Sequence, residues 1–524
     1  MDFTECYQDT CSAIALAARA GDARRVQRLL RRGCSADVKD NRGWNALHEA
    51  AASGSTECVR LLAASKEAME SCNYVNSLTH NSETPLYYAA KNGHLCSVRL
   101  LIEESADPNL KTLDLACPLF AAVDGGHQEV VEVLLQHGAE ANGQRNVSGW
   151  SCLHQAAYRG HADIVRMLAG VSSLEALDDY NITPLFLTAQ YGHSKCLEIL
   201  VQEGANVNCQ ATDLATPLLI AAQEGHLACV EALLSHGANP NLYCNQDQWQ
   251  LPIHAAAEFS RVRILERLLE VTERECECTE GKVSPLYQAV LSEKASSIAP
   301  ILSAGYNPDA QPSFGYTHPL ELAMERFASS PYSSYRRNDE GMEIVRLLLE
   351  AGASVDDRAY SMALCCRHLL PLVLQYRGLP TSWSEREELA WLALDQPDHA
   401  HNWLPLLLRA GMEPALFLHP SLIVVPIAEV IPFFLEFLNW RCLPKEIQKL
   451  VSRRPDLTQE SINMPEGIPP LAHLCRLQLR EYVGSVRLAD SSVVQRLPLP
   501  SLLQHYVQFK DVFTKYCNSW GTIT

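Results

Sequence analysis

The sequence has no uninterrupted apolar run of the length that a membrane span needs. Its most apolar stretch, residues 421–438, is interrupted by Pro426, Glu429, Pro432 and Glu436. Since a spanning helix needs about 20 predominantly apolar residues, this composition favours buried helical packing instead. Residues 1–10 also lack a basic start followed by an apolar run, so we expect no secretory signal and no membrane insertion.

An excess of positive charge is missing as well. The 43 lysines and arginines are outnumbered by 61 aspartates and glutamates, which gives a formal net charge of −18. A chain of this sign repels phosphate backbones and anionic lipid headgroups. We therefore expect neither nucleic acid nor a membrane surface as its main partner.

Common catalytic and metal-binding motifs are absent too. There is no phosphate-binding loop and no Gly-x-Ser-x-Gly sequence. His48-Glu49 begins like the helix of a zinc protease, but Ala52 stands where the second histidine ligand would be. The closely spaced cysteines have no second pair at metal-binding spacing. We predict no catalytic residue, no metal and no cofactor.

The 19 cysteines are spread along the chain, and several occupy apolar positions of a repeated pattern: Cys58, Cys96, Cys196 and Cys229. A buried free cysteine behaves as a small hydrophobic residue and persists in reducing compartments. We expect free thiols and a cytoplasmic protein, with the nucleus also compatible.

The clearest organising feature is a repeated unit, seen best in residues 216–241, TPLLIAAQEGHLACVEALLSHGANPN. Thr-Pro is a favourable helix start, and Gly225 ends this first short helix. A second apolar-striped helix follows and stops at Gly237. Two such helices cannot bury their faces alone, so the unit requires stacked copies of itself.

Ten copies of this unit align on the first residue of the first helix. That residue is Ala13, Ala46, Pro85, Pro118, Cys152, Pro184, Pro217, Pro252, Pro285 and Pro319. The successive spacings are 33, 39, 33, 34, 32, 33, 35, 33 and 34 residues. In the tenth copy, residues 329–341 form an insertion that we expect to be a mobile surface loop.

The period near 33 residues and the T-P-L-x-x-A core resemble the ankyrin repeat. We predict an all-α fold, an ankyrin-repeat α-solenoid of about 10–12 repeats over residues 10–418, with the last one or two degenerate. Histidine recurs at one repeat position, at His94, His127, His161, His193 and His226. A catalytic histidine would not recur in this way, so we expect these rings to bond neighbouring repeats.

Tryptophans stand at or beside the expected hairpin tips, at Trp44, Trp150 and Trp249. Exposed tryptophan is a favoured anchor in protein interfaces, which makes these three candidates for target binding. The alternative is that each ring folds over its own hairpin.

Beyond an apolar packing segment and connector, residues 419–466, the sequence changes character. In residues 467–512, Leu471, Cys475 and Leu479 recur at intervals of four, with Leu474 beside them. This spacing places them along one helix face that suits a partner's groove. Downstream, Leu497, Pro498, Leu499, Pro500 and Leu503 form a stiff apolar turn leading into a last helix.

This module resembles a three-helix SOCS box, and the whole layout resembles the ankyrin repeat and SOCS box family. The resemblance implies that Leu471, Leu474, Cys475 and Leu479 bind elongin. It implies a cullin-binding role, in the form preferred by the fifth cullin, for Leu497, Pro498, Leu499, Pro500 and Leu503.

The implied function is a non-catalytic substrate receptor of a ubiquitin ligase. Its partners would be elongins B and C, the fifth cullin with its RING subunit, and an unknown protein target bound for degradation. The alternative is an ankyrin scaffold that sequesters a partner without degrading it; such a scaffold has no need of both peptide motifs.

Overall fold

The computed structural model describes most of the chain. The described residues are 11–65, 74–142, 146–244, 250–273, 284–310, 317–328, 335–417, 434, 437, 471–483, 491–495, 504–505, 507–510 and 512. They are helical apart from turns, loops and one isolated antiparallel bridge between Cys244 and Gln250. The chain falls into two compact units, Met1–Glu273 and Arg274–Thr524, called unit 1 and unit 2 below.

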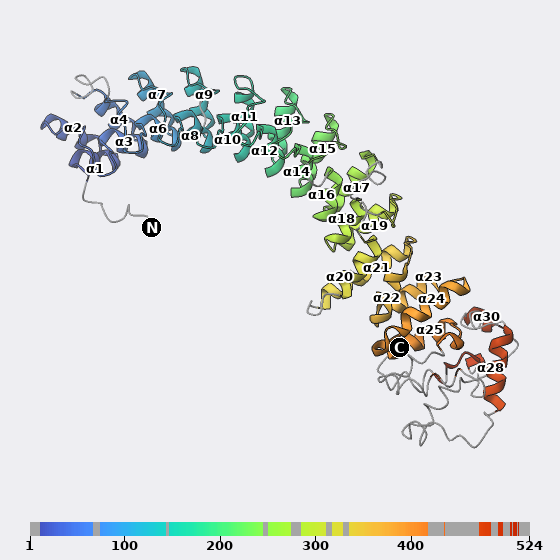
Figure 1. Ribbon diagram of the computed structural model, residues 1–524. Coiled ribbons are helices and arrows are strands. Elements are labelled where there is room, and N and C mark those ends of the chain that lie inside the picture. The colour runs from blue at the N-terminus through green and yellow to red at the C-terminus, as the bar shows by residue number, and fades with distance from the viewer. Residues whose placement is uncertain are drawn as a thin grey trace. The chain divides into compact units, whose positions relative to one another are not determined.

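Unit 1 contains eight helix pairs among its described residues (Figure 1). The first helices are α1 (Ala13–Arg19), α3 (Ala46–Ser53), α6 (Pro85–Lys91), α8 (Pro118–Asp124), α10 (Cys152–Arg159), α12 (Pro184–Tyr191), α14 (Pro217–Glu224) and α16 (Pro252–Glu258). The second helices are α2 (Ala23–Arg31), α4 (Thr56–Ala63), α7 (Leu95–Glu103), α9 (Gln128–Gln136), α11 (Ala162–Ala169), α13 (Ser194–Gln202), α15 (Leu227–Ser235) and α17 (Val262–Val271).

Unit 2 continues the helix-pair pattern and ends with the C-terminal module. Its helices are α18 (Pro285–Leu291), α19 (Ala295–Ser303), α20 (Pro319–Ala328), α21 (Tyr335–Glu350), α22 (Asp357–Cys365), α23 (Leu369–Arg377), α24 (Trp383–Leu394), η3 (Pro397–His399), α25 (Ala400–Ala410), η4 (Pro414–Phe417), α28 (Leu471–Val483) and α30 (Ser491–Gln495). The all-α repeat fold is therefore confirmed.

All ten first helices begin at the residue that the alignment of copies predicts. The side chains of Thr84, Thr183 and Thr216 each accept a hydrogen bond from the backbone N–H three residues on, and proline follows each cap. The cap satisfies a backbone donor that the helix leaves open, and the proline ring fixes the backbone angle of the first turn.

One sequence expectation is wrong. Residues 329–341 were expected to form a mobile loop, yet α21 begins at Tyr335 and runs without a break to Glu350. The second half of the insertion, YRRNDEG, has good helix formers at Arg336, Arg337 and Glu340 beside weaker ones, so the helix that follows can extend back through it. Residues 329–334 lie outside the described residues.

The core of unit 1 lies between repeats as much as within them. Each first helix packs on the next first helix, and each second helix on the next second helix, so that two rows form (Figure 1). Alanines such as Ala50, Ala89 and Ala221 are fully buried where neighbouring first helices meet. Small side chains allow this close approach, and leucines and valines fill the space between the rows.

The recurring Gly-His step connects successive repeats. The rings of His94, His127, His193 and His226 hydrogen-bond through Nε2 to main-chain carbonyls of the preceding repeat at 2.9–3.1 Å. A Cβ on Gly192 would lie 2.5 Å from the His226 ring, so only glycine leaves room for it. The prediction of inter-repeat bonding is confirmed for these four histidines; His161 Nε2 makes no such bond.

Two further expectations concern thiols and membranes. All 13 cysteines among the described residues are free, as expected for a reducing compartment.

None of the described helices has both the length and the apolar character that a membrane span requires. Most of residues 421–438 lies outside the described residues, but Phe434 and Phe437 are buried at 4% exposure each.

The role of the inter-repeat bond can be tested at His226, whose ring bonds to the Gln190 carbonyl at 3.1 Å. We expect His226→Ala to lower the free energy of unfolding by about 1–2 kcal/mol, because it removes this bond and the ring packing. His226→Arg is the matched control, since Arg261 makes the equivalent bond to the Gln223 carbonyl in the next repeat. Urea denaturation followed by circular dichroism measures both; equal losses would contradict the bonding role.

Candidate protein-interaction sites

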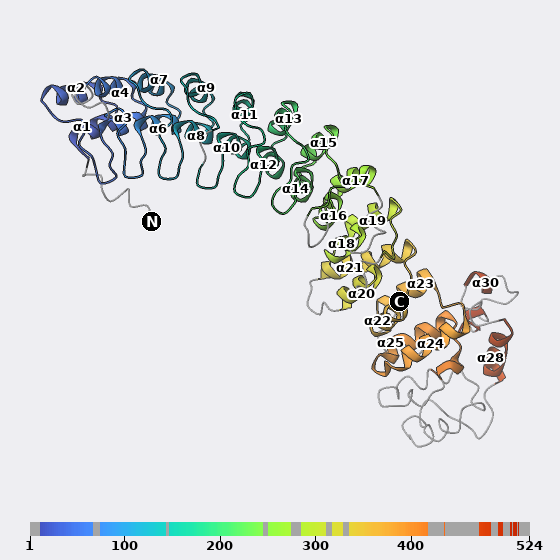
Figure 2. The ribbon, with the colours of Figure 1, turned by 45° about the horizontal axis from the view of Figure 1, so that its top comes forward.

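Hairpin loops connect the repeats of unit 1 and extend side by side beyond the first helices (Figure 2). Six of them are closed by a backbone bond across four residues, such as Asp178 N–H to the Ile182 carbonyl at 3.1 Å, and the last is closed by the bridge between Cys244 and Gln250. Adjacent tips are also bonded: the His80 amide donates to the Arg42 carbonyl, and the Thr212 amide to the Tyr180 carbonyl. The hairpins therefore form a fixed row rather than independent loops.

Trp44, the first of the three predicted target-binding tryptophans, is half-buried. Its ring lies 4.2 Å from the Tyr88 ring of the next repeat, and the Arg42 guanidinium lies 4.4 Å from its centroid. The ring therefore packs on Arg42 of its own hairpin and on the neighbouring repeat, and target binding at Trp44 stays a prediction.

Trp150 is also half-buried and is fixed more tightly. Its Nε1 donates a hydrogen bond of 3.0 Å to Asp178 of the next hairpin, and its ring lies 5.3 Å from Tyr158. Tyr158 in turn meets Tyr191 edge-on at 4.7 Å. The result is an aromatic row that crosses from one repeat to the next. Trp249 lies outside the described residues.

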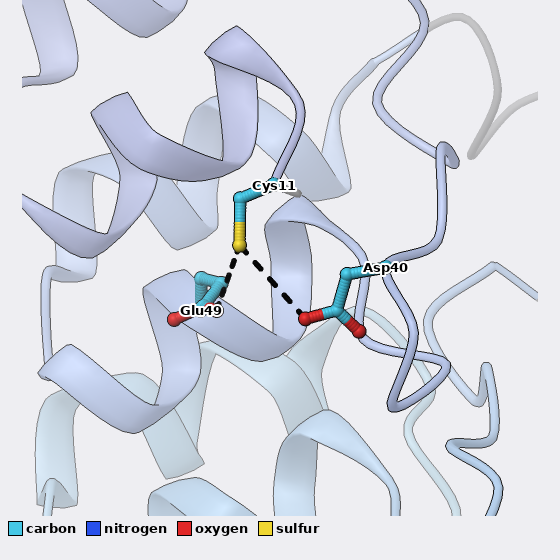
Figure 3. Close-up of side chains that lie close together, drawn as sticks. All are labelled: Cys11, Asp40 and Glu49. Atoms are coloured by element: carbon cyan, nitrogen blue, oxygen red, sulfur yellow. Dashed lines mark hydrogen bonds between the residues drawn. The ribbon is translucent and has the colours of Figure 1, made fainter. Parts of the chain in front are cut away.

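Cys11, Asp40 and Glu49 form a titratable cluster in the first two repeats that sequence reasoning missed (Figure 3). The Cys11 Sγ lies 3.8 Å from Asp40 Oδ2 and 3.9 Å from Glu49 Oε1. However, Arg19 and Arg42 both bond to Glu49, at 2.5 and 2.9 Å.

Two guanidinium groups on these carboxylates repel a metal cation, so the cluster suits an ion network that joins α1 to α3. Burial raises the pKa of the Cys11 thiol, which keeps it in the neutral form at neutral pH.

In the C-terminal module, α28 exposes apolar residues. Cys475 is exposed and Leu479 is 41% exposed, and their spacing of four places them on one helix face. The backbone of Leu471 and Leu474 belongs to the same helix, but their side chains lie outside the described part of the structure.

The two arginines of α28, by contrast, are buried. Arg476 and Arg480 are only 4% and 8% exposed, and both guanidinium groups lie over the Phe509 ring, at 4.4 and 5.0 Å from its centroid. Phe437 stacks on Phe509 at 4.3 Å. Burial and the charge of Arg476 lower the pKa of Arg480 to about 10, while Glu413 opposes this shift.

Among the side chains of α28 that the structure describes, the polarity is therefore inverted. A surface helix of a self-contained domain turns its apolar face inward and its charges outward. Here the ring contacts compensate part of the cost of burying two cations. Val483, which ends α28, packs in a small apolar cluster with Val494 and Val507. The apolar Cys475–Leu479 face is left outward, as in a helix that binds a partner.

The predicted cullin-binding residues are not placed. Leu497, Pro498, Leu499, Pro500 and Leu503 all lie outside the described residues. Helical backbone reappears next to them, in α30 and at Gln504, His505 and Val507.

Comparison with known proteins agrees with this layout. Residues 14–112 and 170–244 match ankyrin repeats (3 copies), residues 119–169 match ankyrin repeats (many copies), and residues 467–508 match the SOCS box. Ankyrin repeat and SOCS box protein 3 of Bos taurus is 41% identical over 520 residues, covering 98% of this chain and 96% of that protein. The Homo sapiens protein of the same name is 41% identical over 526 residues, covering 98% of each.

The chain belongs to the ankyrin repeat and SOCS box family. Its SOCS box and its likeness to these two relatives support a substrate adaptor of a SOCS-box ubiquitin ligase. In such an adaptor the SOCS box implies elongins B and C and a cullin–RING module as partners in general.

The inward position of the arginines in this family member can be tested by proteolysis. In the native protein, trypsin should cut slowly after Arg476 and Arg480 because both are buried. Phe509→Ala removes the ring on which both guanidinium groups lie, so cleavage at both sites should accelerate at least tenfold. His505→Ala, at an exposed position of the same segment, serves as the control. Equal cleavage rates in the two variants, measured by mass spectrometry, would contradict the packing.

Proposed function

We propose that this chain is the substrate receptor of an elongin–cullin–RING ubiquitin ligase that contains the fifth cullin. In this proposal α28 recruits elongins B and C, residues Leu497–Pro500 and Leu503 bind the cullin with its RING subunit, and the array holds a protein target. The target is ubiquitinated and degraded by the proteasome.

The observation that carries the proposal is the inverted polarity of α28. Exposing Leu479 and Cys475 while burying two arginines is unfavourable for a module that stays alone in water. A partner that covers the Cys475–Leu479 face makes this arrangement favourable. An elongin would fulfil that role, with Leu471 and Leu474 from the same helix completing the contact.

In the proposed function the chain is not itself a catalyst. It brings the target close to a ubiquitin-loaded enzyme, so its contribution to the reaction is proximity. Trp44 and Trp150, both half-buried and held by neighbouring repeats, are candidate target contacts, and Trp249 remains a sequence-based one. The free thiols of the described residues agree with action in the cytoplasm, and presence in the nucleus is also compatible.

The elongin contact is tested by Cys475→Phe combined with Leu479→Asp. We expect elongin B and C recovery to fall at least tenfold, because the ring obstructs close approach and the carboxylate enters an apolar contact. Leu16→Asp is the matched control, since Leu16 is a leucine of similar exposure, 37%, in the first repeat. Elongin recovery that survives the double substitution would overturn the adaptor proposal.

The cullin contact is tested separately by replacing Leu497–Pro500 with four alanines. Each buried leucine contributes about 1.5–3 kcal/mol, so cullin binding should fall at least tenfold while elongin binding persists. The cellular target should then accumulate. If cullin recovery and target turnover are both unchanged, these residues form only a structural turn, and a non-degradative scaffold becomes the better description.

A further inference from the structure

Three consecutive hairpins of unit 1 carry a large apolar side chain at their tips. Leu113, Val147 and Tyr180 are 65%, 68% and 66% exposed, the highest values among the large hydrophobic residues that the structure describes. The exposed tip residues of the hairpins before and after them include the polar His80, Asn81, Thr212 and Asp213, and Leu214 of the later hairpin is half-buried. We call Leu113, Val147 and Tyr180 the tip patch.

The hairpins of the tip patch belong to one row (Figure 2). The Leu113 amide donates to the Asn81 carbonyl at 2.9 Å, and the Tyr180 carbonyl accepts from Thr212 at 3.1 Å. A Cβ on Gly149 would lie 2.8 Å from the Asp179 carboxylate, so the second and third hairpins touch. Isolated exposed apolar side chains are ordinary, whereas three at the tips of consecutive hairpins suit an interaction surface.

The tip patch continues into the first helices through the aromatic row. Trp150 is bonded to Asp178, two residues from Tyr180, and leads through Tyr158 to Tyr191, which is 45% exposed. These rings are already held by one another in the free protein. Little conformational freedom is lost when a partner binds, which favours affinity.

The charge beside the tip patch is negative. Asp114, Asp179 and Asp213 are exposed at the tips. Arg159, at the end of α10, is paired with Asp124 at 2.7 Å and so offers little free charge. Lys111 is the one lysine or arginine among the described residues of these hairpins and the next. Among the described residues, a binding partner therefore meets apolar side chains flanked by carboxylates; Arg145, two residues before Val147, lies outside them.

We propose that the tip patch is the surface at which the array binds its target, and that it selects a segment carrying leucine or aromatic side chains flanked by lysine or arginine. Leucine or aromatic rings would contact Leu113, Val147 and Tyr180, and the basic groups would meet Asp114, Asp179 and Asp213. This inference rests on the proposed function, in which the array holds the target.

The test uses a displayed library of random peptides selected on the full-length protein, followed by fluorescence anisotropy with the most enriched peptide. We expect enriched peptides to combine apolar or aromatic residues with lysine or arginine. Leu113→Ser with Val147→Ser and Tyr180→Ser should weaken binding at least tenfold. Val171→Ser, which changes a 53% exposed valine after α11, should leave it unchanged.

A second variant tests the charge. Asp114→Asn with Asp179→Asn and Asp213→Asn should weaken binding severalfold and reduce its dependence on salt. The proposal is overturned if enriched peptides lack basic residues, or if the serine variant, with an unchanged melting temperature, binds as tightly as the native protein. Elongin recovery distinguishes a failure of the tip-patch proposal from a failure of the proposed function. It should stay unchanged in every tip-patch variant, because those substitutions lie in unit 1 and not in α28.

Discussion

The helix pairs of unit 1 depend on their neighbours, because helices of seven to ten residues cannot bury an apolar face by themselves. The contact that repeats most regularly is the histidine ring over a glycine of the preceding repeat, bonded to a main-chain carbonyl. Where histidine is replaced, as at Arg261, a longer side chain makes the same bond to the Gln223 carbonyl. Since this contact fixes the spacing of the repeats, it also places the hairpin tips side by side.

The same dependence explains where binding surfaces arise. Stacking buries the alanines and leucines of the helices and leaves the hairpin tips exposed, so tip residues vary without loss of the core. In the C-terminal module, the buried and exposed positions are occupied differently. There, Phe509 and Phe437 hold two arginines inside, and the apolar face of α28 stays outside for a partner.

Sequence reasoning predicted the fold well because the repeat carries local information at fixed positions. Thr-Pro marks three of the ten first-helix starts, glycine marks several helix ends, and ten copies remove the ambiguity of any one. The helix that begins at Tyr335 was missed because an insertion was equated with a loop, although most of its second half has adequate helix propensity.

The candidate sites were only partly predictable. Spacing alone predicts that Cys475 and Leu479 share one helix face. It does not predict the burial of Arg476 and Arg480, since arginine normally faces solvent. The half-buried packing of Trp44 and Trp150 depends on rings from other positions and other repeats. By contrast, the tip patch has a sequence signature: Leu113 and Val147 stand five residues before a helix start, where every other copy except the tenth, with Phe314, carries a polar residue.

The outward face of α28 is the central claim of this account. Hydrogen–deuterium exchange of the full-length protein, with and without purified elongins B and C, tests it most directly. The account predicts that exchange slows within Leu471–Val483, with no change across the eight helix pairs of unit 1. Unchanged exchange in α28 while the elongins are bound would contradict it, because the contact would then lie elsewhere in the chain.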